Sequence, residues 1–77
     1  MENAISLSAA EAGKRYVVVE LPADRRLRSR LMPLGLIRRS LVVVTHRFGS
    51  YAIVQILNST SIGVSGEAAA GIMVEPR

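Results

Sequence analysis

The sequence has no cysteine and no tryptophan, and its only aromatic residues are Tyr16, Phe48 and Tyr51. Without cysteine it can form neither a disulfide framework nor a thiolate metal site, which is typical of proteins in a reducing compartment. No apolar run approaches the roughly 20 residues that span a bilayer. Residues 1–16 also lack the basic start and sustained apolar stretch of a secretory signal peptide. We therefore expect a soluble, cytoplasmic protein.

Acidic residues are scarce where basic residues are dense. The 77-residue chain carries ten lysines and arginines against six acidic residues, for a net charge of +4. Asp24 is the only acid near six of the ten basic residues, which are Arg25, Arg26, Arg28, Arg30, Arg38 and Arg39. One region of the surface should therefore be strongly positive. Such a region can attract nucleic acid, acidic lipid or an acidic protein face, and charge alone does not choose among them.

Signals for catalysis are also missing. His46 is the only histidine, whereas metal sites of the usual kind need three or four ligands. The carboxylates are scattered, the serines have no obvious base nearby, and the glycines form no phosphate-binding loop. We predict that the protein is not an enzyme and has no cofactor and no metal site.

The N-terminal half should contain a turn, a strand and a short helix within one domain that covers residues 1–77. Ser8 and Glu11 match a capping box that begins a single helical turn. The β-branched run within residues 14–21 is typical of a strand, which Pro22 would end.

Asp24 is a good N-cap for the helix that follows. Three leucines at spacing i, i+4 and i+7 predict a buried face, Leu36 should also be buried, and the opposite face carries two arginines and a methionine. Pro33 should end the regular helix, and Gly35 should supply a left-handed turn. The leucines are Leu27, Leu31 and Leu34, and the opposite residues are Arg25, Arg28 and Met32.

The remaining sequence is typical of a small β-structure. Apolar stretches at 41–44, 51–57 and 61–65 predict a three-strand meander, with Phe48 and Tyr51 as a lid on its core. Residues 66–71 suit one helical turn, and residues 72–74 can form a last strand. We predict a mainly β fold, a small closed or nearly closed barrel of about five strands with one short helix after the first strand and one or two helical turns.

The order of these elements resembles the FeoA family over about residues 7–74. The similarity rests on Gly13, the Val-rich first strand, Arg30-Leu31, Leu34-Gly35-Leu36, the meander, and Glu67-Ala68 followed by Ile72-Met73-Val74. Family members are small cytoplasmic SH3-like barrels that accompany FeoB, the membrane GTPase of bacterial ferrous iron uptake. The resemblance implies the same fold and an accessory role at the cytoplasmic part of such a transporter, without direct membrane insertion.

This chain departs from the family pattern at three places. Arg38-Arg39 stands where a Pro-Gly turn is usual, Asn58 where a glycine is usual, and Ser65 where a basic residue is usual. Asn tolerates left-handed geometry, so the turn at Asn58 can survive. We expect the partner-binding surface to include the arginines of the new turn and the outer helix face, namely Arg25, Arg28, Met32, Arg38 and Arg39.

Alternatives to the transporter remain at this point. The arginines could be only a solvated helix face. A free-standing basic barrel could bind nucleic acid non-specifically, although the arginine cluster contains no aromatic residue for base stacking. An accessory domain of a metal-dependent regulator would have the same fold. The oligomeric state is also open.

Overall fold

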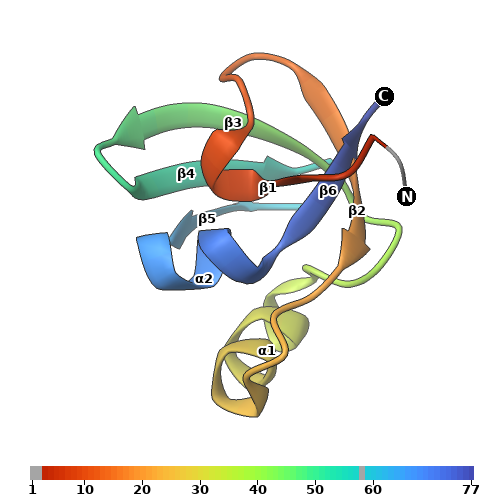
Figure 1. Ribbon diagram of the computed structural model, residues 1–77, viewed down its shortest axis with the longest axis vertical. Helices are drawn as coiled ribbons and strands as arrows, with labels where there is room; N and C mark the ends of the chain where they lie inside the picture. The colour runs from red at the N-terminus through yellow and green to blue at the C-terminus, as the bar shows by residue number, and fades with distance from the viewer. Residues whose placement is uncertain (1–2, 58) are drawn as a thin grey trace.

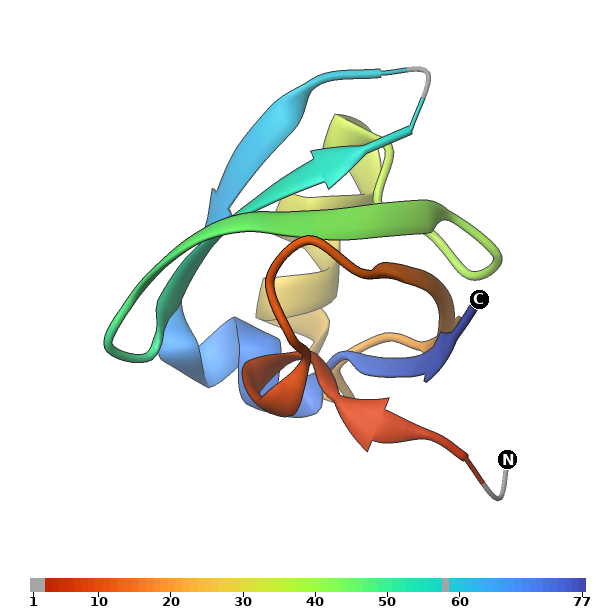
Figure 2. The same ribbon diagram turned by 90° about the horizontal axis from the view of Figure 1, so that it is seen from above.

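The computed structural model describes residues 3–57 and 59–77, which form a curved β-sheet with short helical segments around it (Figures 1 and 2). Asn58, one of the family departures, lies outside the described residues. The elements in chain order are β1 (Ile5–Ser6), the 3-10 turn η1 (Leu7–Ala9), β2 (Arg15–Glu20), α1 (Arg25–Leu31), the 3-10 turn η2 (Met32–Leu34), β3 (Leu41–Phe48), β4 (Tyr51–Ile56), β5 (Ser61–Val64), α2 (Gly66–Gly71) and β6 (Met73–Pro76).

The strands form one antiparallel sheet in the order β1-β6-β2-β3-β4-β5. The C-terminal strand β6 therefore lies between β1 and β2, as the blue strand between the red and orange segments of Figure 1 shows. Helix α2 contacts η1, β1 and β4, and so covers one end of the curved sheet. The predicted small barrel is confirmed, with six described strands rather than about five. The additional strand, β1, has two residues, too few for an alternating pattern to reveal it.

Alternation along the strands directs every second side chain into one apolar core. In β2, for example, Tyr16 and Val18 are buried, whereas Val17 and Val19 face outward and are half-buried. The core contains Leu7, Ala10, Tyr16, Val18, Leu31, Leu36, Val42, Val44, Ala52, Val54, Ile56, Ile62, Val64, Ala68, Ala69, Ile72 and Val74. Among the described residues the buried side chains are apolar, apart from the hydroxyl of Tyr16.

The N-terminal turn forms, but its cap differs from the prediction. Ser6 is the N-cap of η1, and its Oγ accepts a hydrogen bond from the backbone N–H of Ser8 at 3.2 Å. The capping box predicted for Ser8 and Glu11 is therefore wrong. Ser6 also donates to the carbonyl of Ala69 at 3.0 Å, which ties this turn to α2. The cap itself is local, but the bond from Ser6 to Ala69 joins residues that are distant in sequence, so local spacing could not reveal it.

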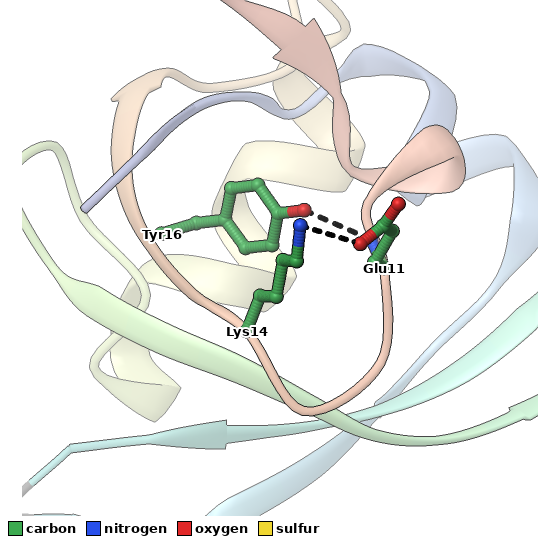
Figure 3. A network of polar contacts seen from close by, with 3 residues as sticks. All are labelled: Glu11, Lys14 and Tyr16. Atoms are coloured by element: carbon green, nitrogen blue, oxygen red, sulfur yellow. Dashed lines mark hydrogen bonds and ion pairs between the residues drawn. The ribbon is translucent and has the colours of Figure 1, made fainter.

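A polar network closes the loop between η1 and β2 (Figure 3). The N–H of Glu11 donates to the Tyr16 hydroxyl at 2.9 Å, and Lys14 Nζ forms an ion pair with the Glu11 carboxylate at 2.7 Å. The hydrogen bond and the negative charge of Glu11 raise the pKa of Lys14 above its ordinary value. Gly13 has a φ of +86°, as a left-handed turn requires.

Helix α1 begins and ends as predicted. The Asp24 side chain accepts a hydrogen bond from the N–H of Arg26 at 2.8 Å. The α-helix stops at Leu31, Pro33 lies in η2, and Gly35 has a φ of +95°. None of the helices described in this chain is long and apolar enough to span a membrane.

The predicted burial of the leucine stripe is only partly correct. Leu31 and Leu36 are buried and Leu27 is half-buried, but Leu34 is 46% exposed. Leu34 shares a groove with Leu27 and Leu31, so the stripe is on the correct face. The opposite wall of that groove includes the small residues Gly63, Ser65 and Ala68, which do not reach far enough to cover Leu34.

The β3–β4 hairpin differs from the prediction in length and at its tip. Strand β3 continues to Phe48 because an irregularity between Val44 and His46 breaks the alternation without ending the ladder to β4. Phe48 is 61% exposed and its ring stacks on His46, so it is not the predicted lid on the core. Tyr51 is also exposed, and its hydroxyl lies directly over Gly63 of β5.

Candidate interaction surface

The predicted partner-binding residues fall into two groups. Arg25 and Met32 are exposed on α1 and η2, whereas Arg28 is half-buried and less accessible than predicted. Helix α1 lies at the opposite end of the molecule from the C-terminus (Figure 1). Arg38 and Arg39 lie together in the turn that leads into β3. Three surface grooves lie among the described residues, and none of them is lined by members of both groups.

The turn at Ile37–Ser40 holds its two arginines in a defined backbone conformation. The N–H of Ser40 donates to the Ile37 carbonyl at 3.1 Å, and the N–H of Arg39 donates to the Val18 carbonyl at 2.7 Å. Ser40 Oγ accepts from the N–H of Ile37 and donates to the Gly35 carbonyl, each at 3.0 Å. Arg39 has a φ of +76° and is the only described non-glycine residue with a positive φ. Left-handed backbone costs an L-residue with a Cβ roughly 1–2 kcal/mol.

A groove separates this turn from the outer surface of β2. It encloses about 520 Å³ and is lined by Val17, Val18, Val19, Arg38 and Arg39. We call it the valine–arginine groove. Arg38 reaches across it, since its Nε donates to the carbonyl of Val19 at 3.3 Å. The sequence signal for this site is the Arg38-Arg39 pair, which stands where the family usually has a Pro-Gly turn. The valine floor of the groove is evident only in the structure.

A second, mostly apolar groove lies between α1, the β4–β5 pair and α2. It encloses about 230 Å³ and is lined by Leu27, Arg30, Leu31, Leu34, Tyr51, Gly63, Val64, Ser65 and Ala68. We call it the leucine–tyrosine groove. Arg30 and Tyr51 therefore lie at one site although they are distant in sequence, a proximity that the sequence did not reveal. Ser65 caps α2 by accepting from the N–H of Ala68 at 3.2 Å.

A third groove is polar and lies beside the second. It encloses about 270 Å³, and it is lined by Asp24, Arg26, Leu27, Arg30 and Glu67. Its two carboxylates partly balance its two arginines, although neither carboxylate comes within ion-pair distance of them in the described residues. This groove is thus less positive than the turn at Ile37–Ser40.

The arginines of α1 and of the turn have no carboxylate partners within the described ranges. The only ion pair there joins Lys14 to Glu11. Arg47 differs from the others because its guanidinium donates to the carbonyls of Leu7 and Ala10, at 3.2 and 2.7 Å. Arg47 is thus held by the fold, whereas the arginines between residues 25 and 39 form no ion pair with the described residues.

The structure brings together no set of metal-binding side chains. Across residues 3–57 and 59–77, no cluster of three or more histidine, cysteine, aspartate or glutamate side chains could hold a metal ion. His46 is exposed, and one of its ring nitrogens lies 3.3 Å from the Thr45 hydroxyl.

Residues 5–76 match the family model of the FeoA domain. The chain belongs to the FeoA family. A FeoA protein from Chlorobium tepidum is 33% identical, with a TM-score of 0.83 over 94% of this chain and 70% of that one. A crystal structure of an iron uptake regulatory protein, FeoA, has a TM-score of 0.85 at 19% identity over 96% and 99% of the two chains. No curated protein matches the chain.

The same fold also occurs within larger proteins. A manganese-dependent transcriptional repressor in complex with manganese aligns with a TM-score of 0.88 at 22% identity, over 96% of this chain but only 37% of the repressor. That likeness shows the fold alone. The FeoA members share the SH3-like barrel predicted from the sequence, and membership in this family of small accessory domains supports a role of the chain in ferrous iron transport.

Proposed function

We propose that this chain acts as a single-domain, non-enzymatic accessory protein of ferrous iron uptake that binds the cytoplasmic part of an FeoB-like membrane GTPase. The observation that carries the proposal is the exposed arginine surface between residues 25 and 39, which has no carboxylate partner within the described residues. A surface of one charge attracts an oppositely charged protein face and speeds the encounter.

Apolar side chains on the same part of the chain can supply the short-range contacts. Met32, Leu34 and Ile37 are each nearly half exposed, and Leu34 lies in the leucine–tyrosine groove beside Arg30 and Tyr51. Interfaces commonly combine an apolar centre with a charged rim. A barrel with these features could act by binding one conformation of the transporter more tightly and so shifting its population.

Charge reversal on α1 tests the proposal against a purified cytoplasmic fragment of the transporter. Arg25→Glu and Arg30→Glu together should weaken binding roughly fivefold at low salt, and the loss should shrink as salt rises. Folding should be nearly unchanged, because the first substitution favours the helix dipole and the second opposes it.

The matched control is Arg15→Glu with Arg77→Glu. It makes the same change in net charge at two exposed residues beside the C-terminus, where the N–H of Arg77 donates to the Arg15 carbonyl at 2.9 Å; the C-terminus lies at the opposite end of the molecule from α1 (Figure 1). This control should bind the fragment like the wild type. Equal loss of binding in both double variants would mean that only net charge matters, and it would remove α1 from the interface. No binding by the wild type would contradict the proposal itself.

Non-specific nucleic-acid binding is the second candidate, and one observation favours it. Tyr51 lies in the same groove as Arg30, so an aromatic ring is closer to the arginines than the sequence suggested. Aromatic rings next to arginines are typical of single-strand binding sites. Binding of a random single-stranded oligonucleotide at about 150 mM salt, without binding of the transporter fragment, would replace the first proposal with this one.

We also propose that the protein acts without a tightly bound ferrous ion of its own. His46 belongs to no cluster of three or more histidine, cysteine, aspartate or glutamate side chains in the described structure. Anaerobic calorimetry with ferrous iron should therefore show no stoichiometric binding in the micromolar range. Stoichiometric binding that is lost in His46→Ala would instead indicate a metal carrier.

A further inference from the structure

The valine–arginine groove combines an apolar floor with two guanidinium groups. Val18 faces the core, while Val17 and Val19 face outward from β2 and are only half-buried. Arg38 and Arg39 form the opposite wall. A ligand in this groove would therefore contact branched aliphatic side chains and positive charge at once.

Arg38 is already positioned over the floor of the groove. Its Nε donates to the carbonyl of Val19 at 3.3 Å, at the point where the register between β2 and β6 is irregular. A guanidinium has five N–H donors in a planar fork. This is the only hydrogen bond of the Arg38 side chain within the described residues, so its other N–H groups remain available to a ligand.

Arg39 lies next to Arg38, and its backbone has a conformation that glycine adopts more readily. Its φ of +76° is fixed by the hydrogen bond from its N–H to Val18 and by the closed turn at Ile37–Ser40. The Arg39 side chain makes no hydrogen bond and no ion pair to the part of the chain that the structure describes. Strained backbone that carries an unused charged side chain is a reason to look for a binding role.

We propose that the valine–arginine groove binds an extended acidic segment of a partner protein, with carboxylates on Arg38 and Arg39 and an aliphatic side chain between them on Val17 and Val19. Arginine forks pair well with carboxylates. No acidic side chain lines the groove, and the nearby Glu75, the register partner of Val17 on β6, forms no ion pair with Arg38 or Arg39 in the described residues. An extended segment suits the site because its side chains alternate in direction. The proposal deepens the proposed function and depends on it only for the identity of the partner.

A nucleic acid or a lipid surface fits this groove less well. The groove has no aromatic lining on which a base could stack. A membrane surface would favour a broad basic face over a recess, whereas here the charge lies at the rim of a groove of about 520 Å³. The aliphatic floor is instead complementary to a valine, isoleucine or leucine side chain.

The test is an NMR titration of the full chain, labelled with nitrogen-15, with a short peptide that alternates glutamate and valine. Amide signals of residues 17–19 and 38–39 should shift most. The matched peptide of glutamine and valine should bind roughly tenfold more weakly if two exposed charge pairs are lost. Equal shifts with both peptides, or shifts confined to α1, would overturn the proposal.

Variants separate the groove from the overall charge. Arg38→Gln with Arg39→Gln should reduce affinity for the glutamate peptide roughly fivefold, whereas Arg25→Gln with Arg26→Gln should leave it within about twofold. Arg39→Gly keeps the turn geometry and should still reduce binding. An Arg39→Gly protein that is folded and binds the peptide as well as wild type would show that this side chain is not used.

A parallel titration with the transporter fragment distinguishes this proposal from the proposed function. Loss of fragment binding in the Arg38 and Arg39 variant supports both. If the fragment binds this variant and wild type equally, and the glutamate peptide does so too, the transporter role stands and the groove proposal is overturned. If only the glutamate peptide binds, and only through this groove, the groove proposal stands and the partner is another acidic protein.

Discussion

The sheet and the segment before β3 use the same kinds of residues in opposite ways. In β3–β6 the large apolar residues that face inward are buried, and the arginine of β3, Arg47, is held by two backbone carbonyls. In residues 25–39 three large apolar side chains are nearly half exposed and most arginines face solvent. Apart from Phe48 and Tyr51 at the tip of the β3–β4 hairpin, which are also exposed, the large apolar residues of these strands are accounted for by folding. The segment before β3 instead presents several side chains that folding leaves unused. This contrast is why we propose that binding uses the less buried part of the chain.

The largest expected effect on stability comes from Leu31, which lies in the segment before β3 but is buried like the sheet residues. Leu31 lies on α1 but is only 5% exposed, so Leu31→Ala should lower the free energy of unfolding by about 2–5 kcal/mol. Leu34→Ala, on the same helical stripe but nearly half exposed, should cost less than about 1 kcal/mol. Urea titrations of the two variants measure the difference. Similar losses of unfolding free energy in the two variants would mean that Leu31 and Leu34 do not differ in burial as described.

Arg47 is the next test, because it should behave as a structural arginine. Its charged hydrogen bonds to Leu7 and Ala10 join β3 to the N-terminal turn, and their loss in Arg47→Gln should cost about 1.5–3 kcal/mol. The matched variant Arg25→Gln should change stability by less than about 0.5 kcal/mol. Thermal or denaturant unfolding decides between them, and equal effects would remove the contrast between the two kinds of arginine.

Replacement of Arg39 by glycine should change stability in the opposite direction from replacement of Arg47. Replacing it with glycine relieves left-handed strain of roughly 1–2 kcal/mol, from which the extra freedom of glycine in the unfolded chain subtracts about 0.5–1 kcal/mol. We expect Arg39→Gly to raise the free energy of unfolding by about 0.5–1 kcal/mol. Arg39→Ala retains the Cβ and should not stabilise. Destabilisation by Arg39→Gly would show that the arginine supports the fold after all.

The smallest effect should come from the exposed ion pair of Figure 3. Glu11 raises the pKa of Lys14 above its ordinary value of 10.5. The stabilisation linked to that shift is fully present below the ordinary pKa and is lost as pH rises through the raised one. Lys14→Gln should therefore leave the pH dependence of stability near neutrality unchanged, as measured by urea titrations at several pH values. A change confined to neutral pH would contradict this assignment.

Much of the fold could be predicted because its signals are local. Asp24 as a cap, Pro33 and Gly35 as the helix end, and the alternating strands each depend on neighbouring residues. The failures depend on distant contacts: Ser6 bonds to α2, and Leu34 faces a wall of small residues from β5 and α2. For the same reason the candidate site was predicted only as four arginines and Met32. Their division between α1 and the valine–arginine groove follows from the packing of β2 against the turn before β3.

The place of β6 has a consequence for how the protein is made. Its partners β1 and β2 leave the ribosome first, but β6 must lie between them before the sheet is complete. Until β6 emerges, β1 lacks this neighbour and one edge of β2 is unpaired. Folding during synthesis should thus remain incomplete until residues 73–76 have left the ribosome, and a nascent chain that stalls before residue 73 should expose apolar strand edges to chaperones and proteases.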